Sequence, residues 1–513
     1  MSGNADEGVA DGTRKSRQQR QRQQRQQPPS NLVIGLEIHC QMTSLESKLF
    51  CPCRADYRGM NPNTNICPVC MGLPGTLPRL NGAAVRKGLM IAAALGCTIP
   101  EKIAFFRKNY FYPDLPKNFQ ITQLNMYGDA SMGGRGAVSV GDRTIRIRRV
   151  QLEEDPGRMV YEGASTGNRT SMADYNRAGT PLVEIVTEPD FESPRHVRLF
   201  LQMLADMMEN LGVCDPALEG SMRADANVSL KGGSRVEIKN INSFHDLEKA
   251  VIFEAARQEA QGAHGMSILQ ETRHWDAGRK ITIPARRKED EEDYRYLLEA
   301  DIPWVAIDRR TLDSLSEQMP EGVGEKRTRY VDVYGIPPQV ADVLSSDKSY
   351  SDLFEAAHTD TNARELASII ANDLMGMAGG LQEGRSEGGR DEWGRGGKKA
   401  DGIIRPEHLR DLADAVVSGL LSRNTAKQVL YKMVRTGRSF ADVSSAMKVD
   451  RISDASDLEE VVTQVILEEP EAVRQAASNP NTINYLVGKV MQKTRGRADP
   501  QITIKILQKR VAD

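Results

Sequence analysis

The residues best suited to chemistry open the first β-rich part of the chain, in the stretch VIGLEIHCQM at 33–42. Because strand side chains alternate between two faces, Glu37 and His39 should point to one side and Leu36 and Ile38 to the other. A carboxylate beside an imidazole could bind a divalent metal ion. An edge strand with one solvent-facing side would show the same pattern, so these residues alone leave both interpretations open.

A second set of residues suits metal binding by sulfur. In LFCPCRADYRGMNPNTNICPVCMG one pair of cysteines is separated by a single residue and a second pair by two residues, at Cys51, Cys53, Cys67 and Cys70. Two close pairs joined by a loop can converge on one tetrahedral ion, and thiolates suit Zn²⁺. With all four positions taken by sulfur, such a zinc ion would be structural. The alternative is four buried thiols without a metal.

Further acids and amides occupy unusual surroundings along the β-rich region. Carboxylates inside apolar β-rich runs are disfavoured unless a cation or a metal faces them. Together with Glu37 and His39, these groups could supply oxygen ligands to Mg²⁺, and Arg and Lys of FRKNYFYPDLPKNFQITQ could neutralise phosphates. Taken one at a time, each of them would ordinarily be structural. The candidates are Glu153, Glu154, Glu184, Asn227 and Glu237.

The common motifs of ATP chemistry do not occur in the sequence. There is no GxxxxGK[ST] loop and no kinase HRD or DFG motif. Any use of ATP would therefore lie outside the common phosphate-binding folds. The formal net charge of −2 over 513 residues also means that nucleic acid would have to bind a local basic patch. No apolar run approaches the roughly 18 residues of a membrane span.

The elements that would position these residues form an α+β region with an antiparallel sheet, predicted for 31–312. Strands do not alternate regularly with helices there, which favours antiparallel pairing. In SPRHVRLFLQMLADMMENLG, Ser193 should cap a helix that begins at Pro194. We expect this region to form a domain that the zinc site stabilises.

Beyond this region the chain becomes helical. We expect an all-helical domain at 325–451 with a Gly-rich insert at 379–401, and a small helical tail domain at 452–513. Asn424 is the expected cap of one helix in the first of these domains. The tail has basic residues that could form a solvated helix surface or bind RNA: Lys489, Lys493, Arg495, Arg497, Lys505, Lys509 and Arg510.

The first thirty residues differ from all others in composition. The stretch TRKSRQQRQRQQRQQPPS is rich in Arg and Gln and has no acidic residue, so we predict a disordered leader at 1–30. Such a leader could be an organellar transit peptide or a basic arm that contacts RNA.

Several long blocks of the sequence resemble, in order, the signature blocks of the GatB family, the B subunit of the tRNA-dependent amidotransferase. They include VIGLEIHCQM, NTNICPVCMGLPGTLP, RKNYFYPDLPKNFQITQ, LEEDPGRM, DYNRAGTPLVEIVTEPD, EGSMRADANVSL and EIKNINSF, and the tail block LVGKVMQKTRGRADPQ. The resemblance extends from about residue 31 to the C-terminus. It implies that 31–312 form a cradle-like, kinase-like catalytic domain that takes the tRNA acceptor end, and that the tail at 452–513 binds tRNA.

The resemblance implies an ATP- and Mg²⁺-dependent activity on misacylated Glu-tRNA(Gln), and in some organisms on Asp-tRNA(Asn). The B subunit would phosphorylate the side-chain carboxylate, and ammonia from a partner amidase, the A subunit, would displace the phosphate to leave Gln-tRNA(Gln). A small C subunit usually joins the two. The motif match would make Glu37 and His39 ligands of the catalytic Mg²⁺, with one of Glu153 and Glu154, the latter slightly favoured. Glu184, Asn227 and Glu237 would be the next candidates, and the zinc knuckle would carry over intact.

Two segments depart from the family pattern, namely the insert at 379–401 and the leader at 1–30. Both would suit an organellar protein, so we expect a mitochondrial location, with chloroplast, or cytoplasm for a bacterial source, as alternatives. Two other functions stay open. A non-catalytic zinc-containing tRNA-binding scaffold would bind RNA without ATP turnover. An adenylating ligase would release pyrophosphate, but its short His/Gly and Lys/Ser signatures are missing from the sequence.

Overall fold

The computed structural model describes residues 31–124, 130–162, 170–241, 243–285, 294–380, 404–447, 455–476, 480–494, 498 and 500–512. The predicted leader and nearly all of the predicted insert lie outside these residues. The chain divides into two compact units between Glu321 and Gly322. None of the described helices is long and apolar enough to cross a membrane.

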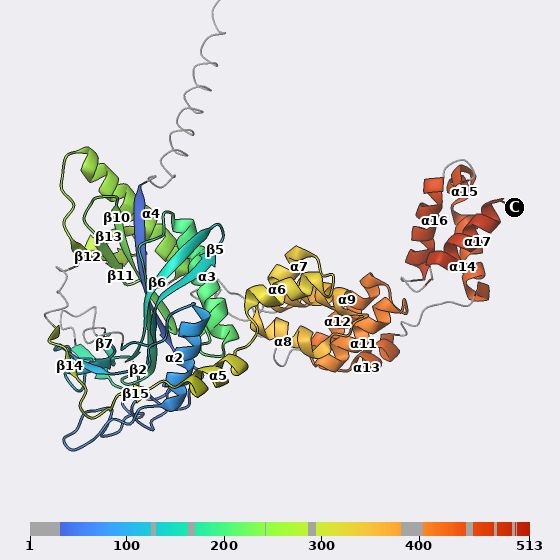
Figure 1. Cartoon of the computed structure of the whole chain (residues 1–513). Helices are drawn as coiled ribbons and strands as arrows, with labels where there is room; N and C mark the ends of the chain where they lie inside the picture. The colour runs from blue at the N-terminus through green and yellow to red at the C-terminus, as the bar shows by residue number, and fades with distance from the viewer. Residues whose placement is uncertain are drawn as a thin grey trace, which may run out of the picture. The chain divides into compact units, whose positions relative to one another are not determined.

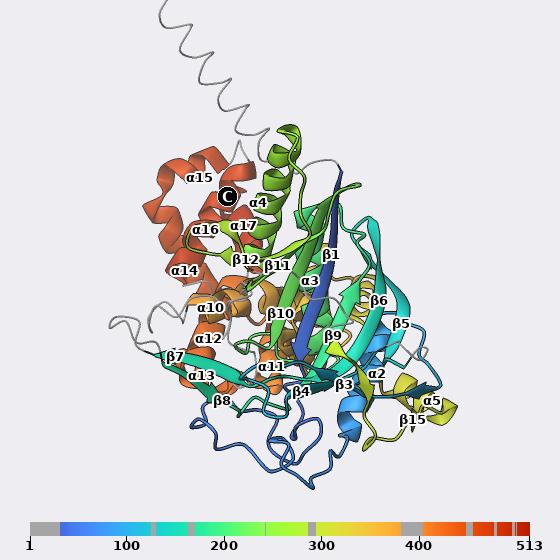
Figure 2. The ribbon, with the colours of Figure 1, turned by 90° about the vertical axis from the view of Figure 1, so that its left-hand side faces the viewer.

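The first unit is built around an eight-stranded sheet in the order β13-β12-β11-β10-β1-β9-β6-β5 (Figures 1 and 2). Neighbouring strands are antiparallel except β11 and β12, which are parallel. This arrangement confirms the predicted α+β class. The strands are β1 (Leu32–Gln41), β5 (Gly133–Val140), β6 (Arg143–Glu154), β9 (Pro181–Thr187), β10 (Met222–Leu230), β11 (Val236–Lys239), β12 (Glu271–Asp276) and β13 (Ile281–Pro284).

One face of this sheet is apolar and is covered by helices. The buried side chains Leu36 and Ile38 of β1 join one hydrophobic core with residues of α2 (Gly82–Ala94), α3 (Pro194–Asn210) and α4 (Phe244–Ala263). Figure 2 shows α3 and α4 against the central strands. Burial of the aliphatic half of each strand is the main stabilising contribution here. It also forces the intervening polar residues onto the opposite face.

Helix α3 begins as the sequence predicts. The Ser193 side chain accepts a hydrogen bond from the backbone N–H of His196 at 3.2 Å, and Pro194 is the first helical residue. This cap satisfies a donor that the helix cannot satisfy itself. The helix ends before Gly212, whose φ of 62° favours glycine.

Smaller sheets accompany the large one. A three-stranded sheet runs in the order β14-β3-β4, and two-stranded pairs form between β15 and β2 and between β7 and β8. Their bounds are β14 (Leu297–Leu298), β3 (Phe106–Asn109), β4 (Phe119–Thr122), β15 (Val305–Ala306), β2 (Lys102–Ile103), β7 (Arg158–Glu162) and β8 (Thr170–Asp174). Helix α5 (Arg309–Gln318) follows β15 and packs on α2.

The second unit is helical and has two hydrophobic cores. The first core lies among α6 (Val323–Asp332), α7 (Pro338–Ser346), α8 (Lys348–Ala357), α9 (Ala363–Ser368), η2 (Ile369–Leu374), α10 (Met375–Gly380), α11 (Pro406–Val417), α12 (Arg423–Thr436) and α13 (Phe440–Met447). The second lies among α14 (Ala455–Glu468), α15 (Pro470–Ala476), α16 (Pro480–Lys493) and α17 (Pro500–Ala512). The domain boundaries at 325–451 and 452–513 stay predictions.

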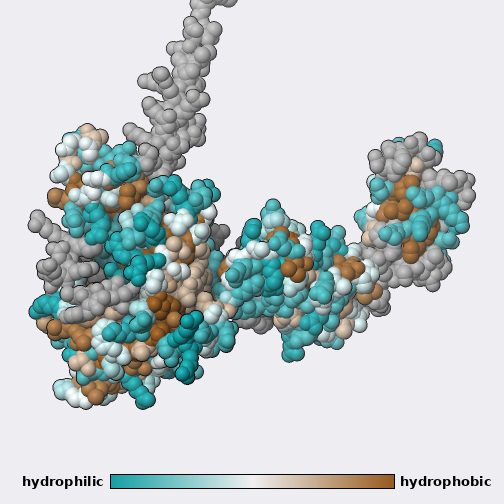
Figure 3. Space-filling model, viewed as in Figure 1, coloured by the Kyte–Doolittle hydropathy of each residue, from teal (hydrophilic) through white to brown (hydrophobic). Residues whose placement is uncertain are grey.

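The helices of the first of these cores are amphipathic. Hydrophilic residues cover most of their surface in Figure 3, as expected for helices whose apolar stripes face a common core. The predicted cap of α12 is wrong. Ser422, and not Asn424, accepts the hydrogen bond from the backbone N–H of Thr425, because the helix begins two residues earlier than the pattern suggests.

Candidate functional site

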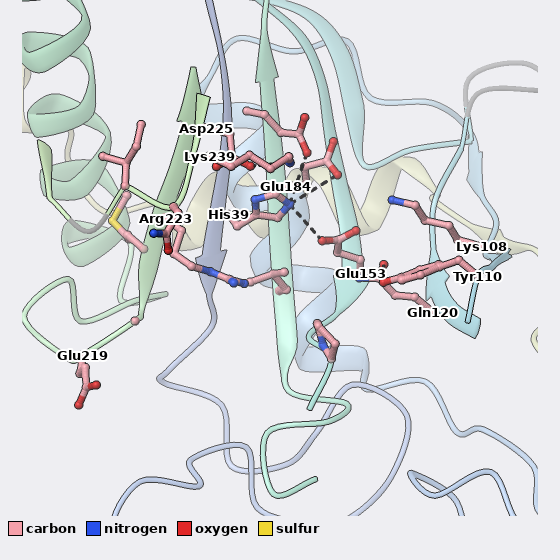
Figure 4. A pocket seen from close by; sticks show the side chains of 17 residues that line it. His39, Lys108, Tyr110, Gln120, Glu153, Glu184, Glu219, Arg223, Asp225 and Lys239 are labelled. Carbon is pink, nitrogen blue, oxygen red and sulfur yellow. Dashed lines mark hydrogen bonds and ion pairs between the residues drawn. The ribbon is translucent and has the colours of Figure 1, made fainter. Parts of the chain in front are cut away.

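The polar face of the large sheet brings four predicted site residues together at its centre. In the antiparallel register, His39 of β1 lies opposite Glu184 of β9, and Glu37 lies on the same face two residues before His39. Glu153 of the neighbouring strand β6 also reaches this point (Figure 4). The alternation of β1 therefore places Glu37 and His39 as the sequence predicts.

The imidazole of His39 is the centre of this carboxylate cluster, which consists of Glu37, His39, Glu153 and Glu184. Its Nε2 atom lies 3.4 Å from Oε1 of Glu153. The same atom lies 3.7 Å from Oε1 of Glu37 and 3.9 Å from Oε2 of Glu184. One ligand atom from each of Glu37, His39 and Glu184 lies within 4.8 Å of the other two. The cluster could therefore hold a metal ion.

Burial and mutual interactions shift the pKa values of these groups. Burial would lower the pKa of His39, but its hydrogen bond to Glu153 and the charges of Glu153 and Glu37 raise it to about 9. Burial would raise the pKa of Glu37, but the charges of His39 and Lys239 lower it to about 2. The pKa of Glu184 is raised, first by burial and then by the charges of Glu37 and Glu153. Perturbed values of this kind gather at functional sites.

Cations surround the carboxylate cluster. A pocket of about 570 Å³ is lined by Glu37, His39, Glu153 and Glu184 together with Lys108, Arg223 and Lys239 (Figure 4). Nζ of Lys239 lies 2.9 Å from Oδ2 of Asp225, while Arg149 pairs with Glu184 at 3.1 Å. A pocket with acids at its centre and cations around them suits a metal ion with bound phosphate groups.

A second cavity of about 420 Å³ ends at the same cluster. It shares Glu37, Lys108, Glu153, Glu184 and Lys239 with the first pocket. It continues past different side chains, among them Tyr112, Tyr294, Tyr296 and His274. Two ligands could therefore approach the carboxylate cluster from different directions.

The structure places Glu154 outside the carboxylate cluster. Its carboxylate pairs with Lys117 and accepts a hydrogen bond from the backbone N–H of Ile121 at 2.9 Å. Adjacent residues of a strand face opposite sides, so Glu153 and Glu154 cannot both reach His39. The slight preference for Glu154 as the metal ligand is thus at odds with the geometry, which brings Glu153 to His39.

The remaining predicted residues lie farther along the same face. Asn227 of β10 and Glu237 of β11 are opposite each other in the register. Glu237 accepts a hydrogen bond from the Thr272 hydroxyl at 2.9 Å, lies 3.4 Å from Nζ of Lys239 and lines the second cavity. The Asn227 side-chain oxygen is buried and has no hydrogen-bond partner among the described residues. Neither residue belongs to the group around His39 that could hold a metal.

Arg223 is a charged residue of the pocket that the sequence pattern did not single out. It lies in MRADANVSL with Asp225 and Asn227, at the period of two that defines one face of a strand. Its guanidinium donates to Asp155 at 3.1 Å and lines the pocket. The same alternation that placed Asn227 on the polar face could have identified it.

The four predicted zinc ligands also come together. The Sγ atoms of Cys51, Cys53, Cys67 and Cys70 lie within 4.8 Å of one another. Four sulfurs at about 2.3 Å from a tetrahedral zinc ion would be about 3.8 Å apart, so this cysteine cluster fits zinc with small adjustments. The backbone N–H of Cys67 donates to Sγ of Cys70 at 3.1 Å. Hydrogen bonds from Cys51 and Cys67 and the charge of Lys48 outweigh burial and lower the pKa of Cys70 to about 5.

Comparison with known proteins decides the family. A model of the GatB/GatE catalytic domain matches residues 32–313, and a model of the GatB domain matches residues 352–511. The chain belongs to the GatB family. The predicted resemblance is thereby confirmed over both units.

Three similar proteins share the same kind of name. A protein of Saccharolobus solfataricus is 42% identical over 480 residues, which cover 93% of this chain and 99% of that protein. A protein of Methanoregula boonei is 38% identical (92% and 96%), and one of Carboxydothermus hydrogenoformans is 37% identical (94% and 98%). Each is named as the B subunit of an aspartyl/glutamyl-tRNA(Asn/Gln) amidotransferase.

These comparisons overturn the predicted location. The relatives are archaeal and bacterial proteins, which argues against mitochondrion and chloroplast alike. The prediction rested on the composition of the leader and the insert. Composition of this kind is not specific to targeting, since Arg-rich segments with few acids also occur as arms that bind nucleic acid. The organellar location is therefore wrong.

Proposed function

We propose that this chain acts in the ATP-dependent transamidation of misacylated tRNA, and that it activates the side-chain carboxylate by phosphorylation. The substrate would be Glu-tRNA(Gln) and also Asp-tRNA(Asn), in keeping with the names of the relatives. The observation that carries the proposal is the carboxylate cluster, which lies at the end of two cavities and is flanked by Lys108, Lys239 and Arg223.

The chemistry requires activation because the oxygen of a free carboxylate is a poor leaving group. A carboxylate oxygen of the aminoacyl side chain would attack the γ-phosphorus of ATP, and ADP would leave. The product is an acyl phosphate. Ammonia would then attack the acyl carbon, and inorganic phosphate would depart with the electron pair of the C–O bond, which leaves the amide.

Phosphoryl transfer depends on positioning and charge neutralisation more than on a covalent nucleophile. The pocket fits this requirement, because its lining combines acids with Lys108, Arg223 and Lys239 and includes no Ser or Cys. Lys108 and Lys239 line both cavities, so they could neutralise phosphate oxygens wherever the two ligands meet. Arg223 lines only the first cavity, and it would bind a carboxylate or phosphate group there.

Glu37, His39 and Glu184 are the residues that we expect to hold Mg²⁺, with Glu153 close enough to His39 to assist. Two carboxylates fit the preference of Mg²⁺ for oxygen, and an open pocket leaves room for phosphate oxygens. When bound, Mg²⁺ would neutralise charge on the transferring phosphoryl group. Asn227 and Glu237 are proposed as more distant contributors on the same face.

We propose a second, structural metal in the cysteine cluster. Four thiolates fill a tetrahedral shell and leave no position for substrate, so Zn²⁺ would stabilise the fold there without taking part in the reaction. ATP would be a co-substrate and Mg²⁺ and Zn²⁺ the metals. The partners would be an amidase (the A subunit), which supplies ammonia from glutamine, a small C subunit and the misacylated tRNA. This amounts to a glutamine-hydrolysing carbon–nitrogen ligase.

Reconstitution tests the proposal. The purified chain is combined with an amidase partner, glutamine, ATP, Mg²⁺ and Glu-tRNA(Gln), and Gln-tRNA(Gln) is measured after hydrolysis of the aminoacyl ester. Product should form only when ATP and this chain are both present. If misacylated tRNA binds but no amide forms with any nucleotide, the chain is the non-catalytic tRNA-binding scaffold.

A further inference from the structure

Lys48 is a lysine buried inside the zinc-knuckle region. Its side chain has no exposed surface, which is rare for lysine. Of the described residues, no carboxylate forms an ion pair with it. Burial of an unpaired ammonium group is costly, so something else must offset that cost.

The contacts of Lys48 point to the cysteine cluster. Its Nζ atom donates a hydrogen bond to the backbone carbonyl of Asn65 at 2.8 Å and lies 3.9 Å from Sγ of Cys70. The backbone N–H of Lys48 bonds to the carbonyl of Cys53 at 2.8 Å. Both ends of this residue are therefore fixed to segments that carry the cysteines.

A cluster of four thiolates around one divalent cation carries a net negative charge, and this charge would also be buried. An ammonium group at hydrogen-bond distance from one of the sulfurs would offset it. The buried ammonium group and the buried anionic cluster thus each reduce the free-energy cost of burying the other's charge.

We propose that Lys48 is the counter-cation of the metal–thiolate cluster and increases its affinity for zinc. This inference rests on the metal that we propose for the cysteines. Lys48 touches no ligand atom of the carboxylate cluster, so it is a positioning residue of the zinc site and takes no part in phosphoryl transfer.

Lys48 lies beside Gly179, which is also close to the cysteine cluster and to Glu154 at the end of β6. A Cβ placed on Gly179 would lie 3.4 Å from Cδ of Lys48, 3.7 Å from Cβ of Cys70 and 3.8 Å from Oε2 of Glu154. The backbone of Gly179 bonds to Leu49 on one side and to Asp155 on the other, both at 2.9 Å. With a φ of +86°, this position favours glycine, and the three segments lie within ordinary van der Waals range of it. Loss of zinc should therefore loosen the end of β6.

The test compares three full-length variants with the wild type: Lys48→Met, Lys48→Arg and the control Lys87→Met. Lys87 also donates to a backbone carbonyl, that of Gly212 at 2.6 Å, but it contacts no sulfur in the described part of the chain. Zinc affinity is measured by competition with a chromogenic chelator, and Co²⁺ replaces zinc so that its thiolate absorption bands report on the coordination. Thermal unfolding is followed with zinc and with excess chelator.

We expect Lys48→Met to weaken zinc binding by about 10- to 100-fold, the usual effect of losing a group that contacts metal ligands. Lys48→Arg should recover part of the affinity, and Lys87→Met should bind zinc as the wild type does. The melting temperature of Lys48→Met should fall mainly in the presence of zinc.

Three results would overturn the inference. Unchanged zinc affinity in Lys48→Met is one of them. An equal loss of stability with and without zinc would make Lys48 an anchor for the Asn65 carbonyl only. A wild-type chain without stoichiometric zinc would remove the premise, while reconstituted transamidation would still report separately on the proposed function.

Discussion

The two candidate metal clusters of the first unit differ in their ligands and in the room they leave for other molecules. The cysteine cluster offers four sulfurs of like chemistry, while the carboxylate cluster offers oxygens and one imidazole nitrogen and borders two cavities. The first has a complete shell. The second leaves room for other molecules, and cations line its walls.

Because of this difference, we expect the cysteine cluster to contribute to stability and the carboxylate cluster to the chemistry. A complete shell of protein ligands contributes its binding free energy to folding, whereas an open set of ligands keeps positions for substrate. Changes in the cysteine cluster should therefore affect mainly unfolding, and changes in the carboxylate cluster mainly turnover.

Asp155 has contacts toward both clusters. Its backbone bonds to Gly179 and Thr180, and its carboxylate faces Gln41 and Arg223.

The largest effect on stability should come from Cys67→Ser. Removing one thiolate weakens a metal whose binding is coupled to folding, so the free energy of unfolding should fall well beyond the roughly 1 kcal/mol of an average substitution. Thermal unfolding and zinc content measure this. Cys97→Ser, outside the cluster, is the control. If the Cys67→Ser chain keeps both its zinc and its melting temperature, the cysteine cluster does not stabilise the fold through a bound metal.

Glu184→Gln should show the opposite pattern. It removes a negative charge from the carboxylate cluster, so ATP turnover should fall by about 100-fold, or roughly 2.7 kcal/mol of barrier. Stability should hardly change, because burial and the charges of Glu37 and Glu153 disfavour a charge on Glu184 and raise its pKa. The matched control is Glu188→Gln, which alters an exposed pair with Arg148 near the end of the same strand. Equal ATP turnover in both variants would show that Glu184 has no role in the reaction.

The smallest effect, and one that depends on pH, should come from Asp155→Asn. Burial would raise the pKa of Asp155, but the charges of Arg177 and Arg223 and a hydrogen bond from Gln41 lower it below its ordinary value. A lowered pKa stabilises the fold above the unfolded value of about 3.9, and this stabilisation is lost as the pH falls through the folded value. The variant should be less stable by about 1–3 kcal/mol at pH 7.

Denaturant unfolding of this variant and the wild type should therefore converge below about pH 4. A difference between the two that does not depend on pH would show that packing, and not charge, accounts for the loss.

Much of this arrangement could be predicted from alternation and spacing. The polar period of β1 placed Glu37 and His39 on one face, and the cysteine spacing predicted the four sulfurs that converge. Glu184 was identified as an acid in an apolar strand, but its position opposite His39 depends on the pairing of β1 with β9, which is a long-range property.

The choice between Glu153 and Glu154 could not be made from the sequence. Alternation says that only one of them can face His39, but it does not say which. Which of them faces His39 depends on the register between β6 and β9 and on the place of β6 in the strand order. Lys48 was missed for a similar reason. Its sequence neighbours give no sign that its side chain turns inward to a carbonyl and a sulfur from a distant loop.

The most direct test of the central claim is the release of ADP from γ-labelled ATP by the purified chain with Mg²⁺ and Glu-tRNA(Gln), in the absence of an ammonia donor. ADP should form only with the misacylated tRNA, and both Glu37→Gln and His39→Ala should lower the rate by about 100-fold, or roughly 2.7 kcal/mol. Tight tRNA binding without ATP cleavage, even after the amidase partner is added, would contradict the account. The carboxylate cluster would then be a polar strand face without a catalytic role.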